Sequence, residues 1–201
     1  VALTLWSKII VACIPAAILG KLLDDWMDAH LYNGLVVSLM LILYGVFFIL
    51  VENRNRKTEP QITKMWQLNY QTALYIGMFQ VLALIPGTSR SGVTILGAVL
   101  LGCSRAIAAE FSFFVGIPIM FGASLLKFVK FGFHFSNAEI VYLVLGMLVA
   151  FLVSVYSIRF LMSWVKKNDF KVFGYYRIVL GVIVLIWYIM STLMGRSMGA
   201  A

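Results

Sequence analysis

The stretch QVLALIPGTSRSGVT, residues 80–94, lies between two apolar segments that are each too short to cross a lipid bilayer. These segments cover residues 73–85 and 93–102, whereas a membrane-spanning helix needs about 17–25 residues. Apolar runs of about 10–14 residues are typical of re-entrant or buried helices. The pattern therefore predicts a helical hairpin over about residues 69–104 that dips into the membrane and returns to the same side.

The composition of the whole chain is that of a membrane protein. Of its 201 residues, 62% are hydrophobic and 12% are charged, against about 25% charged residues in soluble domains. A water-soluble fold cannot bury so much apolar surface, which excludes a soluble enzyme, a disordered chain and a nucleic-acid-binding domain. The net charge of +8 is better explained by Lys and Arg at the cytoplasmic ends of membrane helices.

The longer apolar segments predict the fold class, an all-α polytopic membrane protein with a single integral membrane domain over residues 1–201. The expected spans are residues 3–23, 35–51, 106–128, 140–164 and 172–194. A re-entrant hairpin brings the basic segments 52–64 and 166–171 to the same side of the membrane. A single crossing of the hairpin region would separate them, so the positive-inside rule favours the hairpin, with both segments in the cytoplasm.

The hairpin turn contains Arg90, for which the nearby sequence offers no counter-ion. A charged Arg inside a membrane costs from about 2.5 kcal/mol upward, and no Asp or Glu lies within ten residues of Arg90. An anionic ligand is therefore its natural partner. The alternative is a simple helix break, in which Ser and Thr only cap helices and Arg90 is one more cytoplasmic cation.

The residues around Arg90 have the properties of a phosphate site. Glycines allow close backbone approach, hydroxyls donate hydrogen bonds, and a helix starting near Ser91 would point its N-terminus at an anion. The candidate catalytic residues are Arg90 and Ser89, and the candidate substrate-binding residues are Gln80, Gly87, Thr88, Ser91, Gly92 and Thr94.

Glu110 is the one further charged candidate. It either pairs with Arg105 or another cation at a helix end, or it orients Arg90 once the hairpin packs against the helix that follows. No residue of the chain is a candidate metal ligand. Cys13 and Cys103 form no metal or redox motif and read as small buried hydrophobes, while His30 and His134 lie in polar turns and read as solvated loop histidines.

Residues 79–126, FQVLALIPGTSRSGVTILGAVLLGCSRAIAAEFSFFVGIPIMFGASLL, closely resemble the C-terminal signature of bacterial undecaprenyl-pyrophosphate phosphatases, the bacitracin-resistance protein family. The PGTSRSGVT core and the SRAIAAEFSF continuation are both characteristic. The resemblance implies an inverted-repeat fold in the bacterial cytoplasmic membrane, with an active site opening to the outer face. It also implies that Arg90 grips the pyrophosphate, with Ser89, Ser91 and Thr94 as phosphate ligands and Ser89 a less favoured nucleophile.

One large departure from the family pattern concerns the catalytic motif of the N-terminal half. That motif has two glutamates four residues apart and a Pro-Val-Ser-Ser-x-Gly-His run, and neither occurs here. We therefore expect a family member truncated at its N-terminus that carries the anion-binding half of the site. The resemblance also implies a divalent metal, Mg²⁺ or Ca²⁺, whose ligands are outside this chain.

The function that this resemblance implies is hydrolysis of undecaprenyl pyrophosphate to undecaprenyl phosphate and inorganic phosphate, which recycles the lipid carrier of peptidoglycan synthesis and gives bacitracin resistance. Two alternatives stay open, a polyprenyl-phosphate transporter or flippase, and an inactive fragment of the phosphatase. The expected partners are the lipid substrate, the membrane and, as an option, a second copy of the chain in a homodimer. No nucleic-acid partner is expected.

Overall fold

The computed structural model describes residues 2–56, 58–131, 136–165, 167–193 and 195. These residues form seven α-helices and two short 3-10 turns. The helices are α1 (Ala2–His30), α2 (Gly34–Asn55), α3 (Tyr70–Val81), α4 (Arg90–Leu100), α5 (Arg105–Phe131), α6 (Asn137–Val165) and α7 (Lys171–Leu193), and the turns are η1 (Met65–Gln67) and η2 (Leu82–Leu84).

Five of these helices, α1, α2, α5, α6 and α7, contain segments long and apolar enough to cross a membrane. Helices α3 and α4, of 12 and 11 residues, are too short. The prediction of an all-α polytopic membrane protein is therefore confirmed. The spans also have nearly the expected bounds, because runs of Leu, Ile, Val and Phe without charges are visible directly in the sequence.

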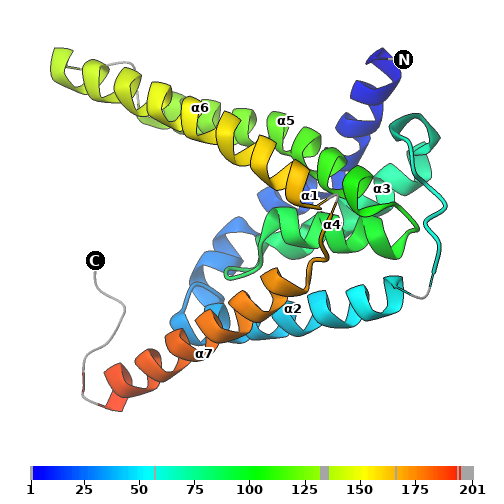
Figure 1. The fold of residues 1–201 in the computed structure, drawn as a ribbon. Helices are drawn as coiled ribbons and strands as arrows, with labels where there is room; N and C mark the ends of the chain where they lie inside the picture. Colours follow the sequence, from blue (N-terminus) through cyan, green and yellow to red (C-terminus); the bar gives the residue numbers. More distant parts are fainter. Residues whose placement is uncertain (1, 57, 132–135, 166, 194, 196–201) are drawn as a thin grey trace.

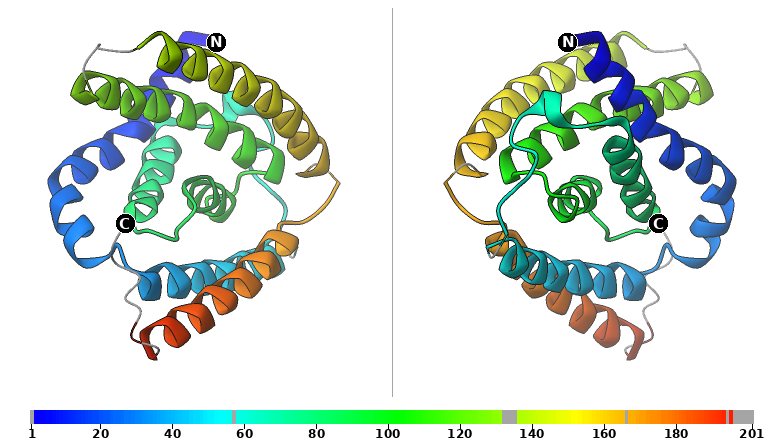
Figure 2. Two further views of the ribbon diagram at one scale, coloured as in Figure 1. Left: turned by 90° about the vertical axis from the view of Figure 1, so that its left-hand side faces the viewer. Right: turned by 90° about the vertical axis from the view of Figure 1, so that its right-hand side faces the viewer.

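The helices form two arms that diverge from a common centre (Figure 1). One arm is the pair α5 and α6, and the other is the pair α2 and α7. Helix α4 lies in the middle of the molecule, and the other helices surround it when it is viewed end-on (Figure 2). The side chains of α4 from Gly92 to Val99 are accordingly all buried. The short helix is thus held by its neighbours, although it carries the polar turn at its N-terminus.

The arm of α2 and α7 is closely packed through glycines. A Cβ atom added to Gly45 would lie 2.8 Å from the carbonyl oxygen of Gly174, and one added to Gly174 would lie 2.7 Å from that of Gly45. Small residues that let two backbones approach are typical of helix contacts in membranes. This contact fixes α7 against α2, and hence the position of the α7 side chains that face the centre.

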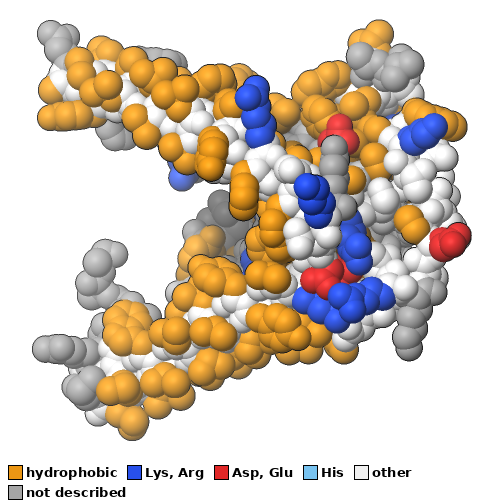
Figure 3. Space-filling model, viewed as in Figure 1, with side chains coloured by type: hydrophobic (Ala, Val, Ile, Leu, Met, Phe, Trp, Pro, Cys, Tyr) orange, Lys and Arg blue, Asp and Glu red, His pale blue; other side chains and the backbone are white. Residues whose placement is uncertain are grey.

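The charged loops gather at one end of the molecule, while the outer parts of both arms are hydrophobic (Figure 3). Buried Glu52, near the end of α2, forms an ion pair with Arg105 at the start of α5 and accepts a hydrogen bond from the backbone N–H of Phe170. Arg56 pairs with Asp169 at 2.5 Å. The segments predicted to share the cytoplasmic side therefore do lie together.

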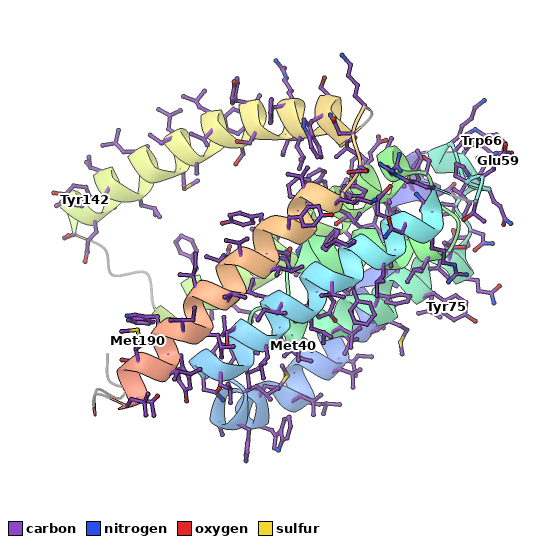
Figure 4. All side chains as sticks on the ribbon, turned by 60° about the horizontal axis from the view of Figure 1, so that its bottom comes forward. Met40, Glu59, Trp66, Tyr75, Tyr142 and Met190 are labelled. Atoms are coloured by element: carbon purple, nitrogen blue, oxygen red, sulfur yellow. The ribbon has the colours of Figure 1, made fainter. Side chains whose placement is uncertain are left out.

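The two ends of the hairpin formed by α3 and α4 lie at this same end of the molecule. The N–H groups of Gln61 and Ile62 donate to the carbonyl oxygen of Gly102 at 2.9 and 3.0 Å. The N–H group of Ser104 donates to the carbonyl oxygen of Ile62 at 2.8 Å. The chain before α3 is thus joined directly to the chain after α4. In Figure 4, Glu59 and Trp66 lie at this end, and Tyr142 and Met190 lie near the far ends of the two arms.

Glu52 should be a major determinant of stability. Replacing Glu52 with Gln leaves the Arg105 guanidinium without its counter-charge. The expected loss is somewhat below the ~3–5 kcal/mol typical of breaking a buried pair, since Arg105 is one third exposed. Unfolding in mixed micelles with rising dodecyl sulfate measures it. Asp169→Asn is the control, because its partner Arg56 is 58% exposed and such pairs contribute about 0–1 kcal/mol. Equal losses in both variants would contradict this ranking.

Several local expectations change. The polar stretch after the first apolar segment is helical rather than a turn, and His30 is the last residue of α1, exposed and stacked on Trp26. His134 lies outside the described residues. Cys103 is fully buried, as predicted, and burial raises the pKa of its thiol to about 11, so it stays a thiol at neutral pH. Cys13 is only partly buried.

Candidate functional site

The site is built on the tight turn that leads into α4. Gly87 has a φ of +87°, a conformation that residues with a Cβ rarely adopt. A Cβ on Gly87 would also lie 2.5 Å from the carbonyl oxygen of Val37 in α2. Both facts require glycine at this position. The turn therefore packs closely against the first turn of α2 (Gly34–Asn55).

Ser89 caps α4, so the helix begins at Arg90, one residue before the expected start. The Ser89 hydroxyl accepts a hydrogen bond from Gly92 N–H at 3.1 Å and lies 3.3 Å from the Ser91 hydroxyl. The first N–H groups of a helix have no partner within the helix. The Ser89 and Ser91 hydroxyls and the positive end of the α4 dipole therefore occupy one place, next to Arg90.

The Arg90 guanidinium lies against α5. Its Nη1 donates to the carbonyl oxygen of Ser112 at 3.4 Å, and a Cβ added to Gly116 would lie 2.5 Å from its Nη2. In the part of the chain that the structure describes, the ion pairs are those of Arg56 and Arg105. The charge of Arg90 is therefore not neutralised by a carboxylate of the described residues, in agreement with the reasoning from sequence.

A cavity of about 530 Å³ lies beside Arg90, between α5 and α6. Its remaining walls are mainly apolar: Ala106, Phe113, Phe114, Gly116, Ile117, Met120, Ile158 and Met162, together with Glu110. Several of these side chains, among them Ile117 and Met120, are also exposed on the outer surface of the helices. The cavity thus connects one guanidinium to the apolar surface of the bundle.

Glu110 lines the same cavity as Arg90 and is partly buried. Arg105, the first of the cations that Glu110 was expected to pair with, is paired with Glu52 instead. Among the described contacts, no hydrogen bond joins Glu110 to Arg90. A role for Glu110 in orienting Arg90 stays a prediction. The structure adds that both side chains line the same cavity.

Thr94 joins α4 to α5 rather than facing open space. Its side chain is fully buried, and its hydroxyl lies 2.6 Å from the Ser112 hydroxyl and 3.0 Å from the carbonyl oxygen of Arg90. These contacts fix the distance between the start of α4 and the part of α5 that supports the guanidinium. The predicted role of Thr94 as a phosphate ligand is not tested by them.

Two other candidates have unused hydrogen-bonding capacity. Gln80, at the end of α3, is 2% exposed, and neither its amide oxygen nor its amide nitrogen has a hydrogen-bond partner. The Thr88 hydroxyl is buried and also without one. Leaving a buried polar group unpaired costs about 1–3 kcal/mol. Both side chains thus have unused capacity for hydrogen bonds in the interior.

Sequence reasoning missed three residues of this region. Ser112 and Gly116 lie on the α5 surface that receives Arg90, and the sequence does not say which residues of α5 meet the turn. Arg177 could have been found, because it is a cation inside the predicted span 172–194. Its guanidinium lies over the ring of Phe48, 5.7 Å from the centroid, and its Nη1 is buried without a hydrogen-bond partner.

The fold and this site define an α-helical, multi-pass membrane protein with a polar site around an arginine in the interior of its helix bundle. The chain belongs to the bacitracin resistance protein BacA family, which it matches over residues 1–183. The prediction of the family is therefore confirmed.

Individual relatives agree with this assignment. The chain is 60% identical to an undecaprenyl-diphosphatase of Enterococcus faecalis, with 91% of this chain and 66% of the relative covered. It is 58% identical to one of Acetivibrio thermocellus, with 92% and 68% covered. For one of Streptococcus thermophilus the identity is 53%, with 95% and 67% covered. The chain thus spans about two thirds of the length of these relatives.

Proposed function

We propose that this chain forms the phosphate-binding part of an undecaprenyl-diphosphatase, which hydrolyses undecaprenyl pyrophosphate to undecaprenyl phosphate and inorganic phosphate. The chain belongs to a family whose relatives carry that name. In the proposed reaction the undecaprenyl carrier of peptidoglycan synthesis is recycled, and bacitracin resistance follows.

The observation that carries the proposal is the position of Arg90. Arg90 is the first residue of α4, where the Ser89 and Ser91 hydroxyls lie 3.3 Å apart, and its guanidinium has no described carboxylate partner. Such an arrangement binds a phosphoryl group through charge-assisted hydrogen bonds and through the helix N-terminus. Negative charge that develops on the phosphoryl oxygens during hydrolysis is stabilised by the same groups.

The cavity beside Arg90 suits a lipid with an anionic head. Its wall holds one guanidinium, while most of its lining is apolar and continues onto the outer surface of α5 and α6. We infer that the pyrophosphate lies at the turn and that the first isoprene units lie between α5 and α6. Burial of each methylene of the tail contributes about 0.8 kcal/mol.

The hairpin is proposed to be re-entrant. Its two ends are joined by backbone hydrogen bonds at the end of the molecule that holds the charged loops. Helix α4 has 11 residues and so extends about 16 Å, roughly half of the ~30 Å hydrocarbon core. Arg90 then lies near the midplane, where sites of inverted-repeat membrane proteins are found. An inverted repeat with the rest of the protein belongs to this proposal.

The described residues do not fit a divalent metal site. They contain no group of three or more His, Cys, Asp and Glu side chains that could hold a metal ion. A divalent metal, Mg²⁺ or Ca²⁺, with ligands from outside this chain stays a proposal. The role of Ser89 as a nucleophile also stays a proposal, and it is the less favoured role because the Ser89 hydroxyl already caps α4 by accepting the Gly92 N–H.

Two further features belong to the proposal. The site is proposed to open to the outer face, opposite the end with the basic loops 52–64 and 166–171. A homodimer is supported only by the exposed apolar surface of α6, which lipid could cover equally well. Cross-linking of single cysteines introduced along α6 distinguishes a dimer from a lipid-covered surface.

The test uses the natural full-length protein that contains this chain, purified into liposomes with undecaprenyl pyrophosphate. Release of inorganic phosphate is the expected result. Movement of labelled lipid between leaflets without phosphate release would overturn the proposal in favour of a transporter. The alternative of an inactive fragment is tested by measuring phosphate release from this chain, expressed alone and together with the remaining part of the protein. Activity that appears only with both parts shows a divided site.

A further inference from the structure

We propose that Arg177 of α7 is a second phosphate-binding arginine, which holds the pyrophosphate together with Arg90. This inference rests on the proposed function, because it assigns a second cation to the same site. The proposed ligand is an anion with two linked phosphoryl groups.

The first observation is the unsatisfied state of Arg177. Its Nη1 is buried and has no hydrogen-bond partner. It lies six residues from the start of α7, about 9 Å along a membrane-spanning helix. An ionisable residue at such depth is costly and usually functional. The titratable side chains that interact with it are Tyr44 and Tyr176, and no described carboxylate forms an ion pair with it.

The second observation connects Arg177 to the turn. Its guanidinium lies over the Phe48 ring, 5.7 Å from the centroid. One edge of that ring packs on the start of α4, because a Cβ added to Gly92 would lie 3.2 Å from Phe48 Cζ and also 3.2 Å from Ser89 Cβ. The Phe48 side chain therefore contacts both Arg177 and the start of α4, the helix that begins with Arg90.

The third observation is that the position of Arg177 is firmly set. The close contact of Gly45 and Gly174 holds α7 on α2, and Gly174 precedes Arg177 by less than one helical turn. Phe48 is itself buried, with 4% exposure. Arg177 is thus presented from the α2 and α7 arm, while Arg90 is supported by α5 of the other arm.

The chemistry favours a diphosphate over a monophosphate. Arginines bind phosphoryl oxygens with two parallel hydrogen bonds, and Arg90 already uses one of its five N–H donors on the carbonyl oxygen of Ser112. Two arginines on different helices can each bind one group. Arg177 should therefore contribute more to binding pyrophosphate than to binding orthophosphate.

The experiment measures competition in the natural full-length protein in nanodiscs. Inorganic pyrophosphate and orthophosphate compete with a labelled polyprenyl diphosphate, and KM and kcat for hydrolysis are measured in parallel. Arg177→Met should raise the Ki of pyrophosphate and the KM about 10–100-fold, as expected for a lost charged hydrogen bond. The Ki of orthophosphate should rise much less, and Arg177→Lys should restore part of the affinity. Arg159→Met, an exposed arginine of α6, is the control.

An unchanged pyrophosphate Ki in Arg177→Met would overturn the inference, as would the same increase in Arg159→Met. A lower unfolding temperature with unchanged Ki and KM would mean that Arg177 only fastens α7 to Phe48, which also overturns it. If the Met variant does not fold, the Lys variant decides, with a severalfold increase expected and no increase contradicting the inference. If the unaltered protein binds pyrophosphate but releases no phosphate, the proposed hydrolysis fails while the Ki values still test Arg177.

Discussion

Replacing Arg90 with alanine should lower the rate of phosphate release by at least about a hundredfold, the usual effect of removing one preorganised donor to a developing negative charge. Arg90 is the charged residue at the start of α4, between Ser89 and Ser91 in the chain. The protein should remain folded, because no described carboxylate loses a partner when Arg90 is removed. Initial rates with undecaprenyl pyrophosphate, in the natural full-length protein, measure the effect.

Two further variants show whether the loss of rate is specific to the guanidinium of Arg90. Arg90→Lys keeps the charge but not the planar fork, so its rate should lie between those of Arg90→Ala and the unaltered protein. Arg159→Ala removes an exposed arginine from another membrane helix and should leave the rate nearly unchanged. A rate for Arg90→Ala within about fivefold of the unaltered protein would be incompatible with the proposed site, given the size of effect expected of such a donor.

Gly116→Ala should lower the rate by about a hundredfold, although it replaces no residue of the turn. The added Cβ would lie 2.5 Å from Arg90 Nη2 and 3.1 Å from Cζ, so the guanidinium must move. Because it is the far end of a flexible side chain that moves, the fold should be little affected. A displacement of about 1 Å at a reacting group can cost about 10²-fold in rate. Rates and unfolding temperatures of the full-length protein are measured together.

The chain offers a matched control for this substitution. Gly122 lies on the same helix, and a Cβ added there meets nothing within 4 Å. Gly122→Ala should therefore leave the rate unchanged and, through the higher helix propensity of alanine, should not lower stability. Equal rates for the two alanine variants would show that Arg90 does not need its position against α5.

The sequence predicts those parts of the molecule that depend on local pattern. Long apolar runs identify the spanning helices, and two short ones identify α3 and α4. The pairing of segments 52–64 and 166–171 at one end follows from the distribution of Lys and Arg. Arg90 stands out because no acidic residue is near it in the sequence.

The remaining features depend on contacts between distant residues. That Arg105 pairs with Glu52 rather than Glu110 depends on where the end of α2 meets the start of α5. Gly116 matters only because α5 presents it to Arg90. The Gln80 amide, unpaired in the interior, is ordinary in sequence and becomes notable only through burial. No periodicity in one chain encodes such pairings, since each is set by how two helices cross.

The tie between residues 61–62 and 102–104 also bears on how the protein is made. Neither α3 nor α4 alone is long enough to be retained as a membrane span during synthesis. A hairpin whose two ends stay together has no loop to carry across the bilayer, so it can enter after the long helices are in place. We therefore expect the segment that bears Arg90 to be the last part of this region to take its position, received by helices already assembled around it.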